Sequence, residues 1–71
     1  MADYSEGDRV EWDWGQGVGQ GRVEEIHKCK LTRKIKGSEI TRNGSDDNPA
    51  LVIVQEDGDQ VLKLSSEVRR A

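Results

Sequence analysis

The stretch LVIVQEDGDQVLKL, residues 51–64, is the part of the sequence that decides the fold. Its two apolar runs flank Asp57-Gly58, and both of these residues tolerate the positive φ angles of a type I′ turn. We therefore predict a β-hairpin with a two-residue turn. In that register apolar residues face each other across the hairpin on both faces: Val54 with Val61, Ile53 with Leu62 and Leu51 with Leu64.

The same register has one unfavourable pair, because it sets Glu56 opposite Asp59. A three-residue loop with Gly58 in the left-handed region would remove this repulsion by shifting the pairing by one residue. We prefer the two-residue turn and keep the longer loop as the alternative.

Upstream of the hairpin, residues 8–14 alternate between apolar and charged side chains. Val10, Trp12 and Trp14 share one face, which predicts a half-buried strand whose tryptophans supply much of the core. Glycine then occupies every second position from Gly15 to Gly21. Because a phosphate-binding loop needs a different ending and a following helix, we interpret this segment as a flexible loop or bulged turn.

The extended run from Arg22 onward changes the parity of its apolar positions twice. Bulges or bends near Glu24-Glu25 and near His27-Lys28 would reconcile the pattern, as in strands that bend to close a small barrel. Cys29 shares the parity of Leu31 and is expected to be a small buried side chain.

A second hairpin is predicted around residues 36–39, with Gly37-Ser38 in a type II′ turn. That turn pairs Lys36 with Glu39 and Ile35 with Ile40. Residues 43–49, NGSDDNP, are too rich in turn formers to be a strand. Residues 65–68 are expected to form one helical turn, with Ser65 as its N-cap.

These elements predict one all-β domain over residues 1–71. Four or five short, bent antiparallel strands and a short C-terminal helical turn fit a closed, small SH3-like barrel at residues 7–66, with frayed tails at 1–6 and 69–71. An OB-fold is the alternative, but it needs more residues and a helix between its strands.

Composition bears on the compartment and the covalent structure of the protein. The chain has 71 residues, a net charge of −3 and one cysteine, so an internal disulfide is excluded. No apolar segment approaches the length of a signal peptide or a membrane span. We therefore expect a monomer in a reducing cytoplasm.

Short motifs matching one known family run in order through most of the chain. They are Gly7-Asp8-Arg9-Val10 with Trp12, Gly15 and Gly17; Gly21 with Val23 and Glu25; Ile35-Lys36-Gly37; Thr41-Arg42; Asp47-Asn48-Pro49-Ala50; and Gln55-Glu56-Asp57-Gly58 through Val61-Leu62-Lys63. In these residues the chain resembles the Tudor-like domain family called hypervirulence-associated proteins, small bacterial and fungal proteins whose family label once read unknown function.

The resemblance implies an SH3-like, Tudor-type barrel and supplies no reaction, cofactor or catalytic residue. The Tudor name suggests reading of methylated lysine or arginine, which needs an aromatic cage of about three or four rings. This chain has three aromatic residues in all, and Leu51 follows Pro49-Ala50 where the family pattern leads us to expect an aromatic.

The leading functional hypothesis is a non-enzymatic module that binds a protein or peptide, because small barrels place ligand contacts on loops held by a rigid scaffold. We expect a groove between the Gly15–Gly21 loop and the Asn43–Ala50 loop. The predicted contacts are Tyr4, Trp14, Gly17, Asp47 and Asn48.

The alternative is nucleic-acid binding through a basic stripe. Residues 28–42 contain six basic side chains and one acid, and the lysines at even positions share one face of an extended strand. The stripe would consist of Lys28, Lys30, Lys34, Lys36 and Arg42. Lysines on an exposed strand also guard against edge-to-edge aggregation, which is the competing interpretation.

No catalytic, cofactor or metal site is predicted. The chain offers no paired nucleophile and base. His27 has only Cys29 near it in sequence, which cannot complete a zinc site, and it is expected to be exposed or at a strand end. The acids near residues 46–47 and 56–59 do not match a calcium loop and are explained by turn chemistry.

Overall fold

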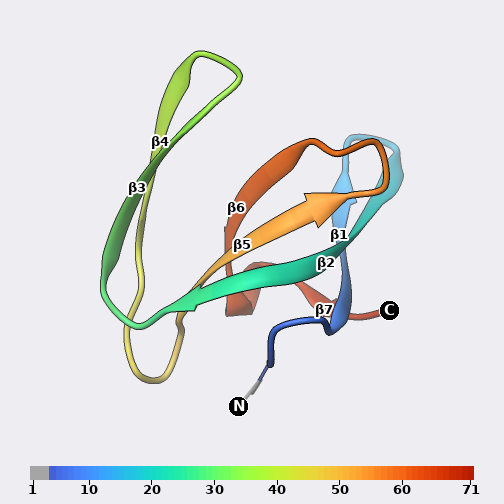
Figure 1. The fold of residues 1–71 in the computed structure, drawn as a ribbon. Helices are drawn as coiled ribbons and strands as arrows, with labels where there is room; N and C mark the ends of the chain where they lie inside the picture. The colour runs from blue at the N-terminus through green and yellow to red at the C-terminus, as the bar shows by residue number, and fades with distance from the viewer. Residues whose placement is uncertain (1–3) are drawn as a thin grey trace.

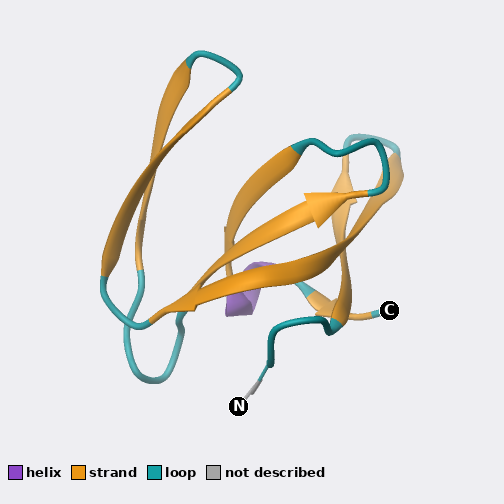
Figure 2. Cartoon of the chain, in the orientation of Figure 1, coloured by secondary structure: helices purple, strands orange, loops and turns teal. Residues whose placement is uncertain are grey.

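The computed structural model describes residues 4–71, which form strands and one short turn of 3-10 helix (Figures 1 and 2). The elements in chain order are β1 (Arg9–Trp14), β2 (Gly17–His27), β3 (Lys30–Ile35), β4 (Ser38–Asn43), β5 (Ala50–Gln55), β6 (Gln60–Leu64), η1 (Ser65–Glu67) and β7 (Arg69–Arg70). The predicted all-β class is confirmed. The described strands number seven rather than four or five, because β7 is an additional two-residue strand and the run after Arg22 is divided between β2 and β3.

The strands form two antiparallel sheets. One has five strands in the order β6-β5-β2-β1-β7, and the other is the β3–β4 hairpin alone. Figure 1 shows this hairpin extending away from the larger sheet. Within residues 4–71 no ladder joins the two sheets, so the barrel is open and the predicted closure is wrong. The chain leaves the larger sheet after His27, where residues 28–29 bend and direct β3 away from β5.

The central hairpin adopts the alternative register. Ile53 pairs with Val61 and Val52 with Leu62, one residue away from the preferred pairing. The loop is Glu56-Asp57-Gly58: Gly58 has φ +90°, and the Gln55 amide donates to the Asp59 carbonyl at 2.7 Å. The longer loop removes the Glu56–Asp59 repulsion and lets Gly58 take the positive φ that the turn requires.

The second hairpin is also shifted. Its two-residue turn is Lys36-Gly37, with φ +51° and +82°, so both central residues have the sign of a type I′ turn rather than II′. Lys34 therefore pairs with Glu39, and Ile35 pairs with Ser38. Gly37 takes the second turn position, where its missing Cβ makes positive φ inexpensive.

The glycine-rich segment is a strand rather than a flexible loop. Only Gly15 and Gln16 form the turn, and Gly17, Gly19 and Gly21 alternate along β2 on the face that contacts the core. A Cβ on Gly19 would lie 2.6 Å from Trp12 Cε2, and one on Gly21 would lie 2.5 Å from Ile53 Cγ2. Side chains on one face of a strand recur every two residues. The glycine spacing therefore follows one face of β2, where the missing side chains leave room for large neighbours.

The main core lies on one face of the five-stranded sheet. It consists of Val10, Trp12, Val23, Leu51, Ile53 and Val68, with Tyr4, Ile26 and Val61 packed at its margin. A second, smaller cluster on the other face joins Ile35 of the β3–β4 hairpin to Val52 and Leu62. β5 is buried on both faces as far as Ile53 because it contributes to both clusters.

Two bends on the way to β3 follow the prediction. A bulge lies between Val23 and Glu25, and residues 28–29 form a bend after β2. Cys29 lies in that bend outside any ladder, so it is exposed and the prediction of a buried thiol is wrong.

The C-terminal helical turn is confirmed, with a different cap. Leu64 is the N-cap, and its amide donates to Glu67 Oε1 at 2.8 Å. Ser65 is the first residue of η1. Residues 69–71, expected to fray, instead lie beside β1, where Arg69 pairs with Glu11. Of the expected N-terminal tail, residues 1–3 lie outside the described residues, while Gly7 donates to the Val23 carbonyl at 2.7 Å.

Candidate functional site

The two loops predicted to form one groove lie at opposite ends of β2. Trp14 and Gly17 flank the β1–β2 turn. At the other end of the strand Gly44 donates to the Cys29 carbonyl at 3.2 Å, and Ala50 pairs with His27. The eleven residues of β2 separate these ends, so the groove expected between the two loops is not formed.

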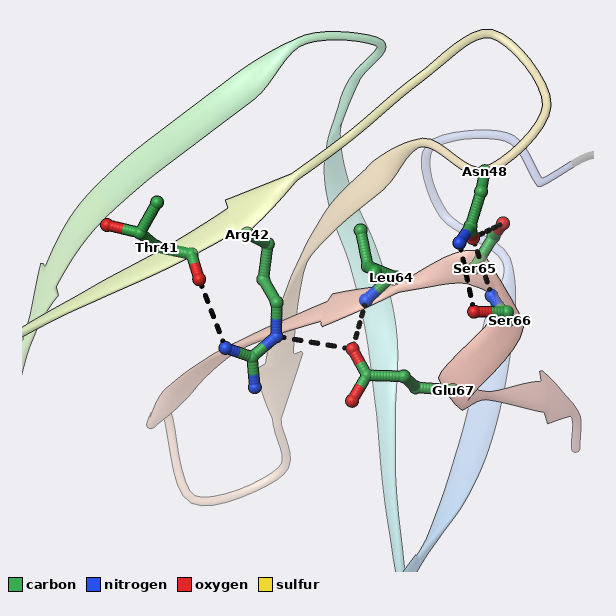
Figure 3. A network of polar contacts seen from close by, with 7 residues as sticks. All are labelled: Thr41, Arg42, Asn48, Leu64, Ser65, Ser66 and Glu67. Atoms are coloured by element: carbon green, nitrogen blue, oxygen red, sulfur yellow. Dashed lines mark hydrogen bonds and ion pairs between the residues drawn. The ribbon is translucent and has the colours of Figure 1, made fainter.

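Asn48, one of the predicted contacts, binds its own chain through both ends of its amide (Figure 3). Its Oδ1 accepts from Ser65 Oγ at 2.8 Å and from the Ser66 amide at 2.9 Å, while its Nδ2 donates to Ser66 Oγ at 3.0 Å. These hydrogen bonds connect the 43–49 loop to η1. The neighbouring Asp47 is exposed on the same loop.

Tyr4 and Trp14 also lie in different surroundings. Tyr4 packs against the main core, its hydroxyl donates to the Val68 carbonyl at 3.3 Å, and the Arg70 guanidinium lies 5.2 Å from its ring centroid. Trp14 is 71% exposed beside the β1–β2 turn. The third aromatic side chain, Trp12, is buried. The structure therefore does not place the three rings around one exposed site, as an aromatic cage requires.

The predicted basic stripe is divided by ion pairs. Lys36 Nζ lies 2.7 Å from Asp59 Oδ2, and Arg42 Nε donates to Glu67 Oε1 at 3.2 Å. The pKa of Lys36 is raised by its hydrogen bond to Asp59, so this ion pair favours the charged lysine. Lys28 is exposed in the bend before β3. Lys30 and Lys34 are exposed on β3, on either side of Thr32, whose hydroxyl is hydrogen-bonded to that of Thr41.

A hollow of about 410 Å³ lies on the five-stranded sheet, formed by β1, β2 and β5, and sequence reasoning did not find it. Across these strands Arg9 pairs with Arg22, and Arg22 pairs with Val54. Cross-strand partners point to the same side of a sheet, so these three side chains form one row. We call this hollow the Arg9–Arg22 groove.

The walls of the groove have charges of both signs. Arg9 and Arg22 lie on the β1–β2 side, and Glu24 and Glu56 also line the groove. Glu24 Oε1 accepts from Gln60 Nε2 at 2.8 Å. Val54, half-buried, supplies apolar surface. The groove therefore combines the apolar surface of Val54 with charges of both signs, which suits a ligand with both apolar and polar groups.

The two arginines in the groove differ from the other four in the chain. Arg33, Arg42, Arg69 and Arg70 each lie within 3.2 Å of a carboxylate oxygen. Within residues 4–71 the structure shows no ion pair or side-chain hydrogen bond for Arg9 or Arg22, and both are exposed. The alternation of residues 8–14 in the sequence places Arg9 on the solvent-exposed face of the strand. Its partner Arg22 is identified only by the β1–β2 register.

A polar cluster holds the β3–β4 hairpin near the end of β2. Glu25 Oε1 accepts from Arg33 Nη2 at 2.7 Å and lies 2.8 Å from His27 Nε2. The hydrogen bond from Arg33 has the largest effect and that with His27 the next largest, and they lower the pKa of Glu25 to about 2. His27, expected to be exposed or at a strand end, is the last residue of β2.

No group of three His, Cys, Asp or Glu side chains within residues 4–71 could hold a metal ion. In the same residues there is no helix of the length and apolar character needed to cross a bilayer.

An open, all-β domain of short antiparallel strands is consistent with a Tudor-type domain, a class of small binding modules. The family model described as the Tudor domain of hypervirulence associated proteins matches residues 7–68, and the chain belongs to that family. No curated protein and no solved structure matches the chain.

Proposed function

We propose that this domain is a non-enzymatic module that binds a protein segment in the Arg9–Arg22 groove. The observation that supports it is the groove itself, where the half-buried Val54 lies in one row with two exposed arginines. Peptide sites need apolar area for affinity and a few polar groups for orientation, and this row offers both.

The neighbourhood of the groove supports an extended ligand. A second, shallower hollow adjoins it and shares Gln20, Gln55 and Glu56, and its lining includes Val18, which is 51% exposed. The exposed Trp14 lies on the same hairpin, near the end of β2 that contains Val18. A segment of several residues could therefore contact the groove and Val18 together. Trp14 and Gly17 alternate with Val18 along the hairpin and point to its opposite face, so they would contact only a ligand that extends past the β1–β2 turn.

A peptide selection followed by NMR tests this proposal. Random peptides are selected on the full chain, and the best binder is titrated into ¹⁵N-labelled protein. We expect amide shifts concentrated at residues 20–24 and 54–56. The variant Val54→Thr, whose fold is checked by circular dichroism, should weaken binding because it removes apolar surface from the groove. Failure to select any binder, or shifts confined to residues 43–49, would refute the proposal.

Nucleic-acid binding is the second candidate, supported by the exposed Lys30 and Lys34 on β3 and the exposed Lys28 in the bend before it. Because Lys36 and Arg42 are bound to acids, three lysines remain for phosphate contacts. Such binding would fall steeply as salt rises. A salt-dependent gel shift that survives replacement of Lys30 and Lys34 by Glu would exclude this surface.

We propose that the domain acts as a monomer in the cytoplasm. The exposed, unpaired Cys29 thiol supports a reducing compartment, where such thiols persist.

A further inference from the structure

From the placement of Arg9 and Arg22 we infer that the groove binds a carboxylate, the acidic side chain of a peptide segment. This inference rests on the proposed peptide-binding function and deepens it. It starts from the β1–β2 register, in which the two arginines are direct cross-strand partners. Directly opposed residues have Cβ atoms about 5 Å apart, so the two guanidinium groups can reach one small anion between them.

The arrangement is unfavourable for the free domain. Like charges directly opposite each other on a sheet repel, and no acid within residues 4–71 is seen to pair with either guanidinium. The same fold pairs its other four arginines with Asp or Glu. Two opposed cations without an acid between them therefore fit a ligand that supplies the anion.

The chemistry of arginine favours a carboxylate as that anion. A guanidinium presents a planar fork of N–H donors that matches the two oxygens of a carboxylate. Val54 continues the row from Arg22, so the methylene groups of an Asp or Glu side chain would have apolar surface beside the charged pair. Glu24 and Glu56 in the same groove would repel a highly charged polyanion, which favours an isolated acidic side chain over a phosphate chain.

The test uses the full chain, peptides of fixed sequence and two groove variants. The peptide selected for groove binding is prepared with its acidic residue as Glu and, separately, as Gln. Arg22→Gln and Arg9→Gln are expected to weaken the Glu peptide about tenfold each, as for a charge-assisted hydrogen bond, and to leave the Gln peptide unchanged. Lys34→Gln, which removes the same charge from the exposed hairpin, should change neither by more than about twofold.

Two further readouts separate binding from folding. The Nε–Hε signals of Arg9 and Arg22 should shift with the Glu peptide and not with the Gln peptide. Arg22→Gln should unfold at the same or a higher urea concentration than the natural chain, because it relieves like-charge repulsion.

Three outcomes would overturn the inference. Selected peptides that bind the groove equally well with Arg9→Gln and Arg22→Gln would refute carboxylate recognition while leaving peptide binding intact. Arginine shifts with inorganic phosphate but not with the Glu peptide would assign the pair to phosphate. Stronger shifts of the same signals with a single-stranded oligonucleotide would assign it to nucleic acid.

Discussion

Gly19 shows how one missing side chain determines the position of a core residue. The Trp12 indole lies against the Gly19 backbone so closely that an added Cβ would be 2.6 Å from Trp12 Cε2. Because Trp12 is buried in the main core and has little room to move, Gly19→Ala should destabilise the fold by about 1–3 kcal/mol. Urea unfolding monitored by tryptophan fluorescence measures this loss.

Gly17 provides the matched control for this substitution. It lies two residues earlier on the same face of β2, but the nearest atom to an added Cβ is the Trp14 carbonyl oxygen at 3.8 Å. Gly17→Ala should therefore change stability by less than about 0.5 kcal/mol. Equal losses for the two variants would show that the close approach of Trp12 does not cause the cost of a side chain at Gly19.

Glu25 should make part of the stability depend on pH. Its ordinary pKa of 4.5 falls to about 2 in the fold, because Arg33 and then His27 hydrogen-bond the carboxylate. The folded state therefore favours the ionised form, and its contribution is complete above about pH 4.5 and lost as pH falls towards 2. Glu25→Gln should destabilise the protein at pH 7, and the difference should shrink between pH 4.5 and 2.

Thermal unfolding of both proteins across this pH range measures the effect. Glu6→Gln, which changes an exposed carboxylate in the N-terminal turn, is the control and should show no such convergence. A constant difference between Glu25→Gln and the natural chain down to pH 2 would contradict the lowered pKa.

At the scale of elements, the 43–49 loop is held to η1 by Asn48 (Figure 3). The Asn48 amide makes three hydrogen bonds to Ser65 and Ser66, and Ser65 is buried. Asn48→Ala leaves the Ser65 hydroxyl without this partner, so we expect a loss of about 1–3 kcal/mol. Exchange of the Ser66 amide proton should also accelerate.

The neighbouring Asp47 gives the comparison for this variant, since it is exposed on the same loop. Asp47→Ala should change stability by less than about 0.5 kcal/mol. If Asn48→Ala is equally harmless, the network does not fasten the loop. In that case Asn48 would be available as a ligand contact, as the sequence analysis predicted.

The sequence predicted the elements better than their registers. Alternating apolar residues identified β1, a continuous apolar run identified β5, and turn formers located both hairpins within two residues. The two-residue turn preferred at Asp57-Gly58 was wrong, because the apolar residues on both sides allow either pairing. Contacts outside the hairpin decide the pairing, since Ile53 must pack with Val23 while Val52 and Leu62 pack with Ile35.

At the scale of the whole molecule, the β3–β4 hairpin should open more easily than the larger sheet. An isolated two-stranded hairpin is marginally stable, and this one depends on the small Ile35 cluster and on three ion pairs to the rest of the domain. Hydrogen exchange followed by NMR should show faster exchange in β3 and β4 than in β2 and β5. Equal protection in all four strands would contradict this division.

The candidate site illustrates why the whole molecule is needed. Arg9 and Arg22 are thirteen residues apart in sequence, and Val54 follows thirty-two residues later. No short-range sequence pattern identifies these three residues as a group. The predicted contacts were chosen from loops, yet Asn48 and Tyr4 bind their own chain, and the two loops lie at opposite ends of β2. The β1–β2–β5 register alone brings the arginines and Val54 into one row.

By itself, the sequence determined that this chain forms strands, the neighbourhood of each hairpin turn and most of the core, because alternation and turn chemistry act over a few neighbouring residues. Cys29 and Trp14, both expected inside, are exposed. Only the tertiary structure decided the two registers, the open barrel and the Arg9–Arg22 groove. These depend on pairing between distant strands, where neighbouring registers have similar local energies and packing against the rest of the domain selects one.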